Sequence, residues 1–329
     1  KQTLSKITMY RFKSILKQTL WGGEKIKLLK HIPDAPSQIG ESWELSAVEG
    51  NVSTIEGGSE DGVLLTDLID RDKERLMGRH NYERFGHRFP LLIKFIDANT
   101  DLSIQVHPND EIAHKQGKER GKTEMWYALP CEPDAKLYNG LKMKITPEEY
   151  KKMVENDTIT DALAQYEAKE DDCFFLPAGR IHAIGTGCFL AEIQQTSDVT
   201  YRIYDFKRKD KDGNYRQLHT KEAAECINYT VEDDYRTHYE HKKNEGVTLV
   251  ECPYFKTSEL KLTQTFVRDY QEEDTFHVYM CLSGQCCFLS PDGQGIFLHS
   301  GESLVVPACM KQVTIIPDGQ CKLLESGVI

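Results

Sequence analysis

The sequence predicts a mainly β fold, built from two related β-barrels with a few added helices. The first supporting observation is a series of short apolar runs, rich in β-branched and aromatic residues, that alternate with Gly, Pro and Asp. This pattern is typical of strands and turns in a barrel or sandwich. The expected strands are "SWELSAV", "VLLTDLI", "LLIKFIDA", "MWYALP", "CFFLPAG" and "FLAEIQQ".

The second observation is an internal repeat. "KTEMWYAL" followed by "EDDCFFLPAGRIHAIGTG" is echoed by "DTFHVYMCLSGQCCFL" followed by "HSGESLVVPACMKQVTIIPDG". In each copy, two apolar strands separated by an acidic or glycine turn precede a Pro-Ala step and a third strand, which indicates two copies of one unit. His182 follows Pro177 by five residues, whereas Gln312 follows Pro307 by five. Only the first copy therefore carries side chains suited to chemistry.

The β pattern returns after about residue 240, which suggests a boundary between two domains. We expect an N-terminal catalytic domain with helical additions over residues 1–240, and a C-terminal barrel without a metal site over 241–329. The clearest helix begins at Thr146, the N-cap of "TPEEYKKMVEN", with Pro147 at the first helical position. Further helices are expected in "TDALAQYEA" and "TKEAAECI", and a surface loop in "DFKRKDKDGNYRQLHT".

Composition limits the compartment and the partners. Apolar runs such as "PLLIKFI" are too short to span a bilayer, and the N-terminus has no apolar stretch of signal-peptide type, so we expect a soluble protein. The ten cysteines include no CxxC pair, which favours reduced thiols and the cytoplasm. The net charge of −11 argues against nucleic acid or an anionic membrane as partners. An anionic substrate would therefore need locally placed Arg or Lys.

The first copy also has the donor atoms of a metal site. In "LSIQVHPND", Ile104 and Val106 alternate with polar residues, so one face of the expected strand carries a hydroxyl, an amide and an imidazole. Two imidazoles, a carboxylate and an amide oxygen suit Zn²⁺ or another divalent first-row ion. The candidate ligands, which a closed barrel would bring face to face, are Gln105, His107, Glu124 and His182.

These motifs resemble those of a known family. "PAGRIH" resembles the second, PxGxxH motif of cupins, and "QVH" stands where their first motif has HxH. The glutamine, and the seventeen residues from His107 to Glu124, depart from the general cupin pattern. At those departures the sequence resembles short, bacterial-type members of the type I phosphomannose isomerases. The matching stretches cover most of residues 15–230 and are "LWGGEKI", "IGESWELS", "PLLIKFIDAN", "LSIQVHPND", "GKTEMWY", "PAGRIHAIG" and "EIQQTSDVTYRIYDF".

The resemblance implies a cupin-like fold and a zinc-dependent aldose–ketose isomerase with one Zn²⁺ per chain. The enzyme would interconvert mannose 6-phosphate and fructose 6-phosphate through an enediol, so its partner would be a small phosphosugar. By the resemblance, the residues lining the substrate cleft are Lys94, Lys122, Asp198 and Arg202. Arg202 is a catalytic candidate, and Ser103 and Lys94 are possible phosphate contacts. The candidates for the proton-transferring base are Lys122, Asp198 and Glu192.

Two other functional classes stay open. An iron-dependent cupin dioxygenase also needs two His and a carboxylate, but the phosphate-ready Lys and Arg residues speak against it. A non-catalytic sugar-binding cupin would be expected to lose a metal ligand or the arginine of "SDVTYR", and this chain has both. We assign Trp43 and Trp126 to core or barrel-mouth packing, with the alternative that either borders a sugar, and Trp21 to a turn. The metal loaded in the cell and the oligomeric state are left open.

Overall fold

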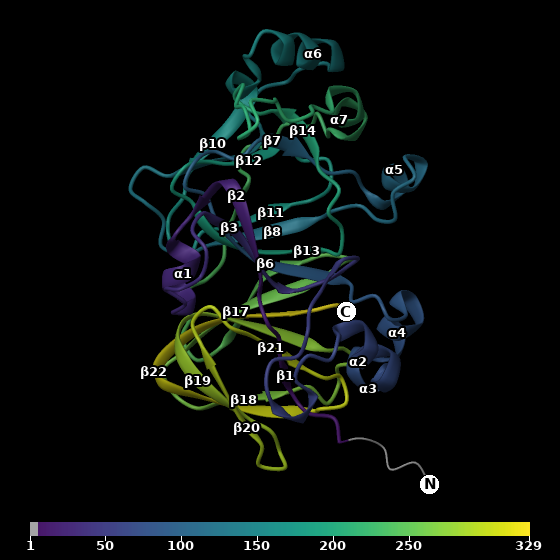
Figure 1. The fold of residues 1–329 in the computed structure, drawn as a ribbon, viewed down its shortest axis with the longest axis vertical. Helices are drawn as coiled ribbons and strands as arrows, with labels where there is room; N and C mark the ends of the chain where they lie inside the picture. The colour runs from purple at the N-terminus through teal and green to yellow at the C-terminus, as the bar shows by residue number, and fades with distance from the viewer. Residues whose placement is uncertain (1–5) are drawn as a thin grey trace.

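The N-terminal lobe of the computed structural model, which describes residues 6–329, is a barrel formed by two facing antiparallel sheets (Figure 1). The seven-stranded sheet has the order β15-β11-β8-β13-β6-β3-β2. Its strands are β2 (Ile15–Gly23), β3 (Ile39–Leu45), β6 (Leu91–Asp97), β8 (Glu124–Ala128), β11 (Cys173–Leu176), β13 (Phe189–Gln195) and β15 (Arg236–Thr237). The five-stranded sheet, in the order β10-β9-β12-β7-β14, contains β7 (Ile104–Val106), β9 (Lys136–Leu141), β10 (Leu163–Glu167), β12 (His182–Ile184) and β14 (Tyr201–Tyr204).

The C-terminal lobe is a single eight-stranded sheet with the path β1-β21-β19-β22-β17-β16, to which β18 and β20 add. Its strands are β1 (Tyr10–Arg11), β16 (Gly246–Glu251), β17 (Lys256–Leu262), β18 (Phe266–Asp269), β19 (His277–Leu289), β20 (Gly295–His299), β21 (Ser303–Val306) and β22 (Gln312–Gly327). A small hairpin joins β4 (Ala47–Val48) to β5 (Asn51–Val52). The mainly β prediction is confirmed, while the domain division at residue 240, which falls between β15 and β16, stays a prediction.

Short helices lie around these sheets (Figure 1). They are α1 (Lys25–Lys30), α2 (Leu65–Asp72), α3 (Glu74–Met77), α4 (Arg79–Phe85), α5 (Asp110–Lys115), α6 (Pro147–Glu155) and α7 (Thr220–Cys226), with 3₁₀ turns η1 (Gly58–Glu60) and η2 (Ile159–Ala162). As predicted, Thr146 caps α6: its side chain accepts from the Glu149 N–H, and Glu149 accepts from the Thr146 N–H. Within residues 6–329, no helix is long and apolar enough to cross a membrane.

Two sequence predictions of secondary structure are wrong. "VLLTDLI" was expected to be a strand but forms most of α2, where Leu65, Leu68 and Ile69 are buried. Their i, i+3, i+4 spacing is helical, and a short apolar run does not distinguish helix from strand by itself. "TDALAQYEA" was expected to be a helix, but after η2 it becomes β10, which pairs with β9. Pairing with that neighbouring strand outweighs the helical propensity of its Ala and Glu residues.

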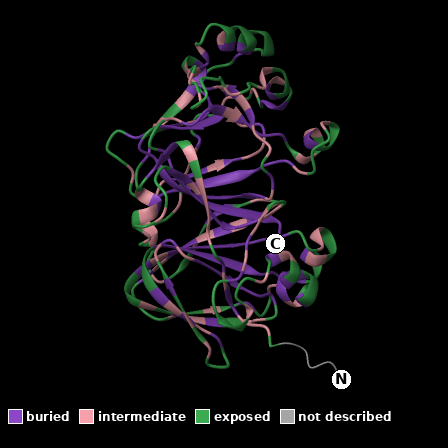
Figure 2. Cartoon of the chain, in the orientation of Figure 1, coloured by how far each residue is buried: buried purple, intermediate pink, exposed green. Residues whose placement is uncertain are grey.

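Strand β6 explains how the core places polar side chains in the first barrel. All seven of its residues are buried, because one face packs toward the C-terminal lobe and the other lines the first barrel (Figure 2). Leu91, Ile93 and Phe95 belong to the apolar core that joins the two lobes. Lys94 lies on the opposite face, since side chains alternate along a strand, and it opposes Glu192 on β13. The cation therefore points into the barrel.

The internal repeat has a counterpart in strand register. In the N-terminal lobe Leu176 pairs with Glu124, and in the C-terminal lobe Val306 pairs with His277. The third strand of each copy, β12 or β22, begins six residues after these positions. The C-terminal counterpart of Glu124 is thus an imidazole, and His277 is bound to Glu273 at 2.7 Å. The imidazole of His277 and the carboxylate of Glu273 therefore satisfy each other.

Candidate active site

The two sheets of the first barrel bring His107, Glu124 and His182 together, and we call these residues the metal triad. Glu124 begins β8, His182 begins β12, and His107 directly follows β7. Glu124 Oε1 lies 3.2 Å from His182 Nε2, and Glu124 Oε2 lies 3.5 Å from His107 Nε2. The candidate ligand atoms all lie within 4.8 Å of one another, and all three residues are buried. Gln105, the fourth predicted ligand, places its amide nitrogen 3.4 Å from His182 Nε2.

The hydrogen bonds of the metal triad fit a divalent cation. His107 Nδ1 donates to the Val199 carbonyl and His182 Nδ1 to the Arg180 carbonyl, each at 2.8 Å. Each ring therefore directs the lone pair of Nε2 toward Glu124, as in a metal site with oriented histidines. His107 Nε2 and both Glu124 oxygens are buried and have no hydrogen-bond partner within residues 6–329. Such atoms are costly to bury unless a cation meets them.

The charge states of the metal triad also suit metal binding. Burial and the Lys122 ammonium lower the pKa of His107 to about 3, and burial lowers the pKa of His182. Burial alone would raise the pKa of Glu124, but Lys122 and His107 hold it well below its usual range. At neutral pH the group therefore offers two neutral imidazoles and one carboxylate, which is a common donor set for first-row ions.

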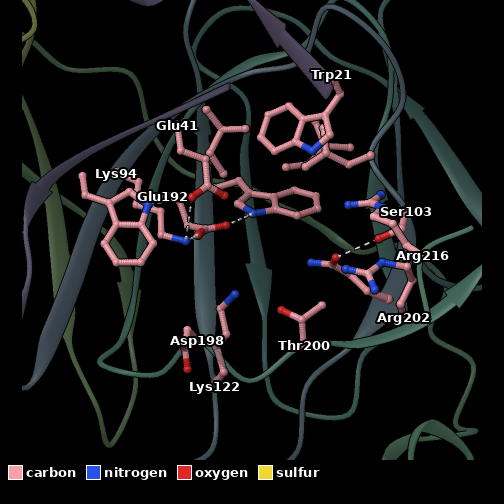
Figure 3. Close-up of a pocket in the computed structure, with 16 residues that line it drawn as sticks. Trp21, Glu41, Lys94, Ser103, Lys122, Glu192, Asp198, Thr200, Arg202 and Arg216 are labelled. Carbon is pink, nitrogen blue, oxygen red and sulfur yellow. Dashed lines mark hydrogen bonds and ion pairs between the residues drawn. The ribbon is translucent and has the colours of Figure 1, made fainter. Parts of the chain in front are cut away.

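A cavity of about 360 Å³ opens beside Gln105. Its volume lies in the range of small-molecule sites. Figure 3 shows charged and polar side chains at two opposite sides of it. One side carries Glu41, Lys94 and Glu192, and the other carries Ser103, Arg202 and Arg216. The remaining lining residues are Trp21, Trp43, Ile96, Leu102, Lys122, Trp126, Ile184, Asp198 and Thr200.

The side of the cavity that carries Glu41, Lys94 and Glu192 is a row of polar groups in contact with one another. Lys94 Nζ lies 3.6 Å from a Glu41 oxygen and 3.5 Å from Glu192 Oε1. Trp126 Nε1 donates to Glu192 Oε2 at 2.9 Å. Burial and the nearby Glu124 carboxylate raise the pKa of Glu192 to about 7. Burial acts to lower the pKa of Lys94, but Glu41 and Glu192 raise it overall.

Lys122 and Arg202 reach the cavity from different elements. Lys122 lies in the extended segment before β8, and its Nζ is 3.5 Å from Glu124 Oε2, so the two side chains share a face as the sequence predicted. Arg202 extends from β14 and donates to the Gln217 carbonyl at 2.8 Å. Its Nε is buried and has no hydrogen-bond partner among the described residues. Both cations thus keep donors for a ligand in the cavity.

Comparison with known proteins assigns the family. The model of the phosphomannose isomerase type I catalytic domain matches residues 9–171. Mannose-6-phosphate isomerase ManA of Bacillus subtilis is 34% identical over 302 residues, which are 90% of this chain and 92% of the relative. The chain belongs to the type I phosphomannose isomerase family. A mannose-6-phosphate isomerase of Streptococcus mutans is 30% identical over 95% of this chain and 96% of its own length.

The structure agrees with this phosphomannose isomerase assignment. The crystal structure of the Bacillus subtilis mannose 6-phosphate isomerase superposes with a TM-score of 0.86 at 28% identity, covering 97% of this chain and 99% of that one. An apo mannose 6-phosphate isomerase from Salmonella typhimurium has the same fold, with a TM-score of 0.77 at 16% identity over 98% of this chain and 99% of that one. The likeness therefore extends over both lobes.

The structure brings every site residue predicted from the sequence into one region of the first barrel. The metal triad and Gln105 lie together, and Lys94, Ser103, Lys122, Glu192, Asp198 and Arg202 line the adjoining cavity. Sequence reasoning missed Glu41, Thr200 and Arg216. Glu41 lies in the matching stretch "IGESWELS", which was the available signal, whereas Arg216 lies in a charged loop with no such signal. Trp43 and Trp126, assigned to packing, also border the cavity.

Proposed function

We propose that this chain is a metal-dependent aldose–ketose isomerase that interconverts D-mannose 6-phosphate and D-fructose 6-phosphate through an enediol. The observation that carries the proposal is the juxtaposition of the metal triad with a cavity whose two sides differ in charge. The arginine side suits a phosphate, and the carboxylate and lysine side suits proton transfer between C1 and C2. Holding the sugar at both ends would align its reacting carbons with these groups.

We propose Zn²⁺ as the metal, with one ion per chain held by Gln105, His107, Glu124 and His182. Two imidazoles, a carboxylate and an amide oxygen match the usual zinc donors, and isomerisation needs no change of metal oxidation state. When bound, the ion supplies Lewis-acid stabilisation of the negative charge that develops on the enediolate. A half-turn of the Gln105 carboxamide exchanges its oxygen and nitrogen, so that the oxygen faces the same point as the His182 lone pair.

Glu192 has the strongest case as the proton-transferring base. It is 3% exposed and lines the cavity, and its Oε1 has no hydrogen-bond partner among the described residues. A pKa near 7 allows a carboxylate to accept and return a proton at neutral pH. Lys122 beside Glu124 is suited to stabilise charge near the metal, and Asp198 on the cavity wall remains the third candidate.

Removing the metal tests the proposed function. Mannose 6-phosphate should be converted to fructose 6-phosphate by the purified protein, and a chelator should abolish turnover by withdrawing the Lewis acid. Re-addition of Zn²⁺ should restore the rate. Fructose 6-phosphate is measured directly, with parallel reactions under air and without oxygen. Turnover that requires oxygen would favour the dioxygenase alternative, and binding without turnover would favour a sugar-binding protein.

Arg202→Lys should lower kcat more than it raises KM, by about 10²-fold or more, with metal content unchanged. This result follows if the guanidinium contacts the developing enediolate charge, because lysine cannot reproduce two parallel hydrogen bonds. Steady-state kinetics separates the effects on kcat and KM. A loss carried mainly by KM would assign Arg202 to phosphate binding, and near-normal constants would remove it from the site.

A further inference from the structure

Arg216 reaches the cavity from a loop that the sequence marks only as charged. Its guanidinium makes two parallel hydrogen bonds to Asp205, from Nε to Oδ2 at 2.8 Å and from Nη2 to Oδ1 at 2.6 Å. This two-point contact fixes the plane of the guanidinium and leaves Nη1 for a further acceptor. Arg216 lines the cavity beside Ser103 in Figure 3. The cavity thus has a guanidinium of fixed orientation in its wall.

The carboxylate of Asp205 is itself fixed by its place in the fold. Asp205 directly follows β14, the strand that presents Arg202, and it is only 6% exposed. Arg208 also donates to its Oδ1, at 2.6 Å, and binds the main-chain carbonyl of Asp101 through its other nitrogen. One buried carboxylate thus orients two arginines while the adjacent strand positions a third.

Arg202, Arg208 and Arg216, which we call the arginine cluster, carry more charge than Asp205 neutralises. Three guanidinium groups and one carboxylate leave an excess of two positive charges. Burial and the nearby Arg216 guanidinium lower the pKa of Arg202, so the two arginines that line the cavity repel each other. The protein has a net charge of −11, so a local positive field requires several cationic side chains placed close together. Arg202 and Arg216 line the cavity, so a phosphate dianion bound there would meet two of these guanidinium groups.

We propose that Arg216 binds the phosphate group of the substrate and determines the preference for phosphorylated over neutral sugars, with Asp205 as its positioning residue. This inference rests on the proposed function for the identity of the sugar, but the phosphate subsite is testable without turnover. Arg216 lines the cavity, and its hydrogen bonds to Asp205 use Nε and Nη2, which leaves Nη1 available to a ligand while Asp205 holds the guanidinium in place. Loss of either residue therefore weakens phosphate binding without removing any group that transfers a proton.

The test compares Arg216→Met, Arg216→Lys and Asp205→Asn in the zinc-loaded protein. Arg216→Met should raise KM for mannose 6-phosphate by about 10- to 100-fold, the range for hydrogen bonds to a charged group, while kcat changes by less than about three-fold. The dissociation constant of inorganic phosphate, measured by calorimetry, should rise by a similar factor. For Arg216→Lys, KM and the phosphate dissociation constant should lie between those of the wild type and those of Arg216→Met. Asp205→Asn should weaken phosphate binding less than Arg216→Met does.

Arg236→Met is a matched control, because Arg236 forms a similar ion pair. The Arg236 side chain is 28% exposed and lies 2.8 Å from Asp172, whereas the Arg216 side chain is 27% exposed and lies 2.6 Å from Asp205. This control should leave phosphate affinity unchanged. Unaltered phosphate affinity in both Arg216 variants would overturn the proposal, as would equal losses in Arg216→Met and Arg236→Met. If the wild type binds phosphate through Arg216 but does not isomerise mannose 6-phosphate, the phosphate subsite stands and the proposed function fails. Should Arg216→Met not fold, Arg216→Lys gives the same comparison.

Discussion

His107→Ala is expected to remove the metal and, with it, nearly all activity. The imidazole is one of three buried donors that converge within 4.8 Å, and its Nε2 has no other partner among the described residues. Without it, one carboxylate and one imidazole remain from the metal triad, too few for a tight first-row site. We expect less than about a tenth of an equivalent of metal after dialysis, and kcat lowered by about 10³-fold or more.

The fold should survive this replacement. Glu124 keeps its contacts with Lys122 and His182, so the remaining carboxylate is not left buried without a counter-charge. Because the pKa of His107 is already lowered to about 3, the wild-type imidazole is neutral at pH 7 and binds metal without displacing a proton. Elemental analysis and circular dichroism give the measurements. His114→Ala is the control, since His114 is exposed and binds only the Glu119 carbonyl among the contacts described.

About one full equivalent of metal in His107→Ala would refute the ligand assignment. A folded variant that lacks metal but keeps full turnover would instead refute the proposed chemistry. These outcomes separate where the metal binds from what it does.

The sequence allowed the metal site to be predicted because its signals are local. Gln105 and His107 are two residues apart in one β-type segment, and His182 follows Pro177 by five residues. Each position is set by strand periodicity or by a turn, which neighbouring residues encode. Glu124 was assigned as a carboxylate on another β-type segment of the same copy, and its distance in space from His107 depends on how two sheets face each other. No single segment of the sequence determines how the two sheets face each other.

The missed features depend on contacts between distant segments. The sequence "DFKRKDKDGNYRQLHT" predicts that Arg216 is a solvated charge. In the structure Arg216 lines the cavity, where it is bound to Asp205. Glu41 joins the cavity because β3 lies beside β6, which places it near Lys94. The same limit explains the error over β10, whose partner strand β9 lies more than twenty residues earlier. Local propensity predicts an element well only where no distant neighbour overrides it.

Glu192→Gln should lower kcat by about 10² to 10⁴-fold while leaving the metal in place. Glutamine keeps the shape of the side chain and can still accept the hydrogen bond from Trp126 Nε1, but it cannot take a proton from the substrate. The side chain is not part of the metal triad, so metal content should match the wild type. Incorporation of solvent deuterium into the product should be lost with turnover, because proton exchange at C1 and C2 needs the base.

The pH dependence gives a sharper test of this assignment. Burial and the Glu124 carboxylate raise the pKa of Glu192 to about 7, so the carboxylate is largely protonated below that pH and ionised above it. Since the base acts in its ionised form, kcat/KM of the wild type should rise as pH increases through about 7 and then level off. Lys94 acts to lower this pKa, so Lys94→Met should move the rise to higher pH. Glu192→Gln should lack the rise altogether.

Lys122→Met and Asp198→Asn complete the comparison, because each removes one of the other two candidate bases. Lys122→Met should retain the metal, since an ammonium is not a ligand, and should lower turnover while keeping the acid limb of the pH profile. If Glu192→Gln still exchanges solvent deuterium and one of these variants does not, the base is the residue replaced in that variant. Glu192 would then act only as the counter-charge of Lys94, whose Nζ lies 3.5 Å from Glu192 Oε1. It would contribute to substrate binding and not to proton transfer.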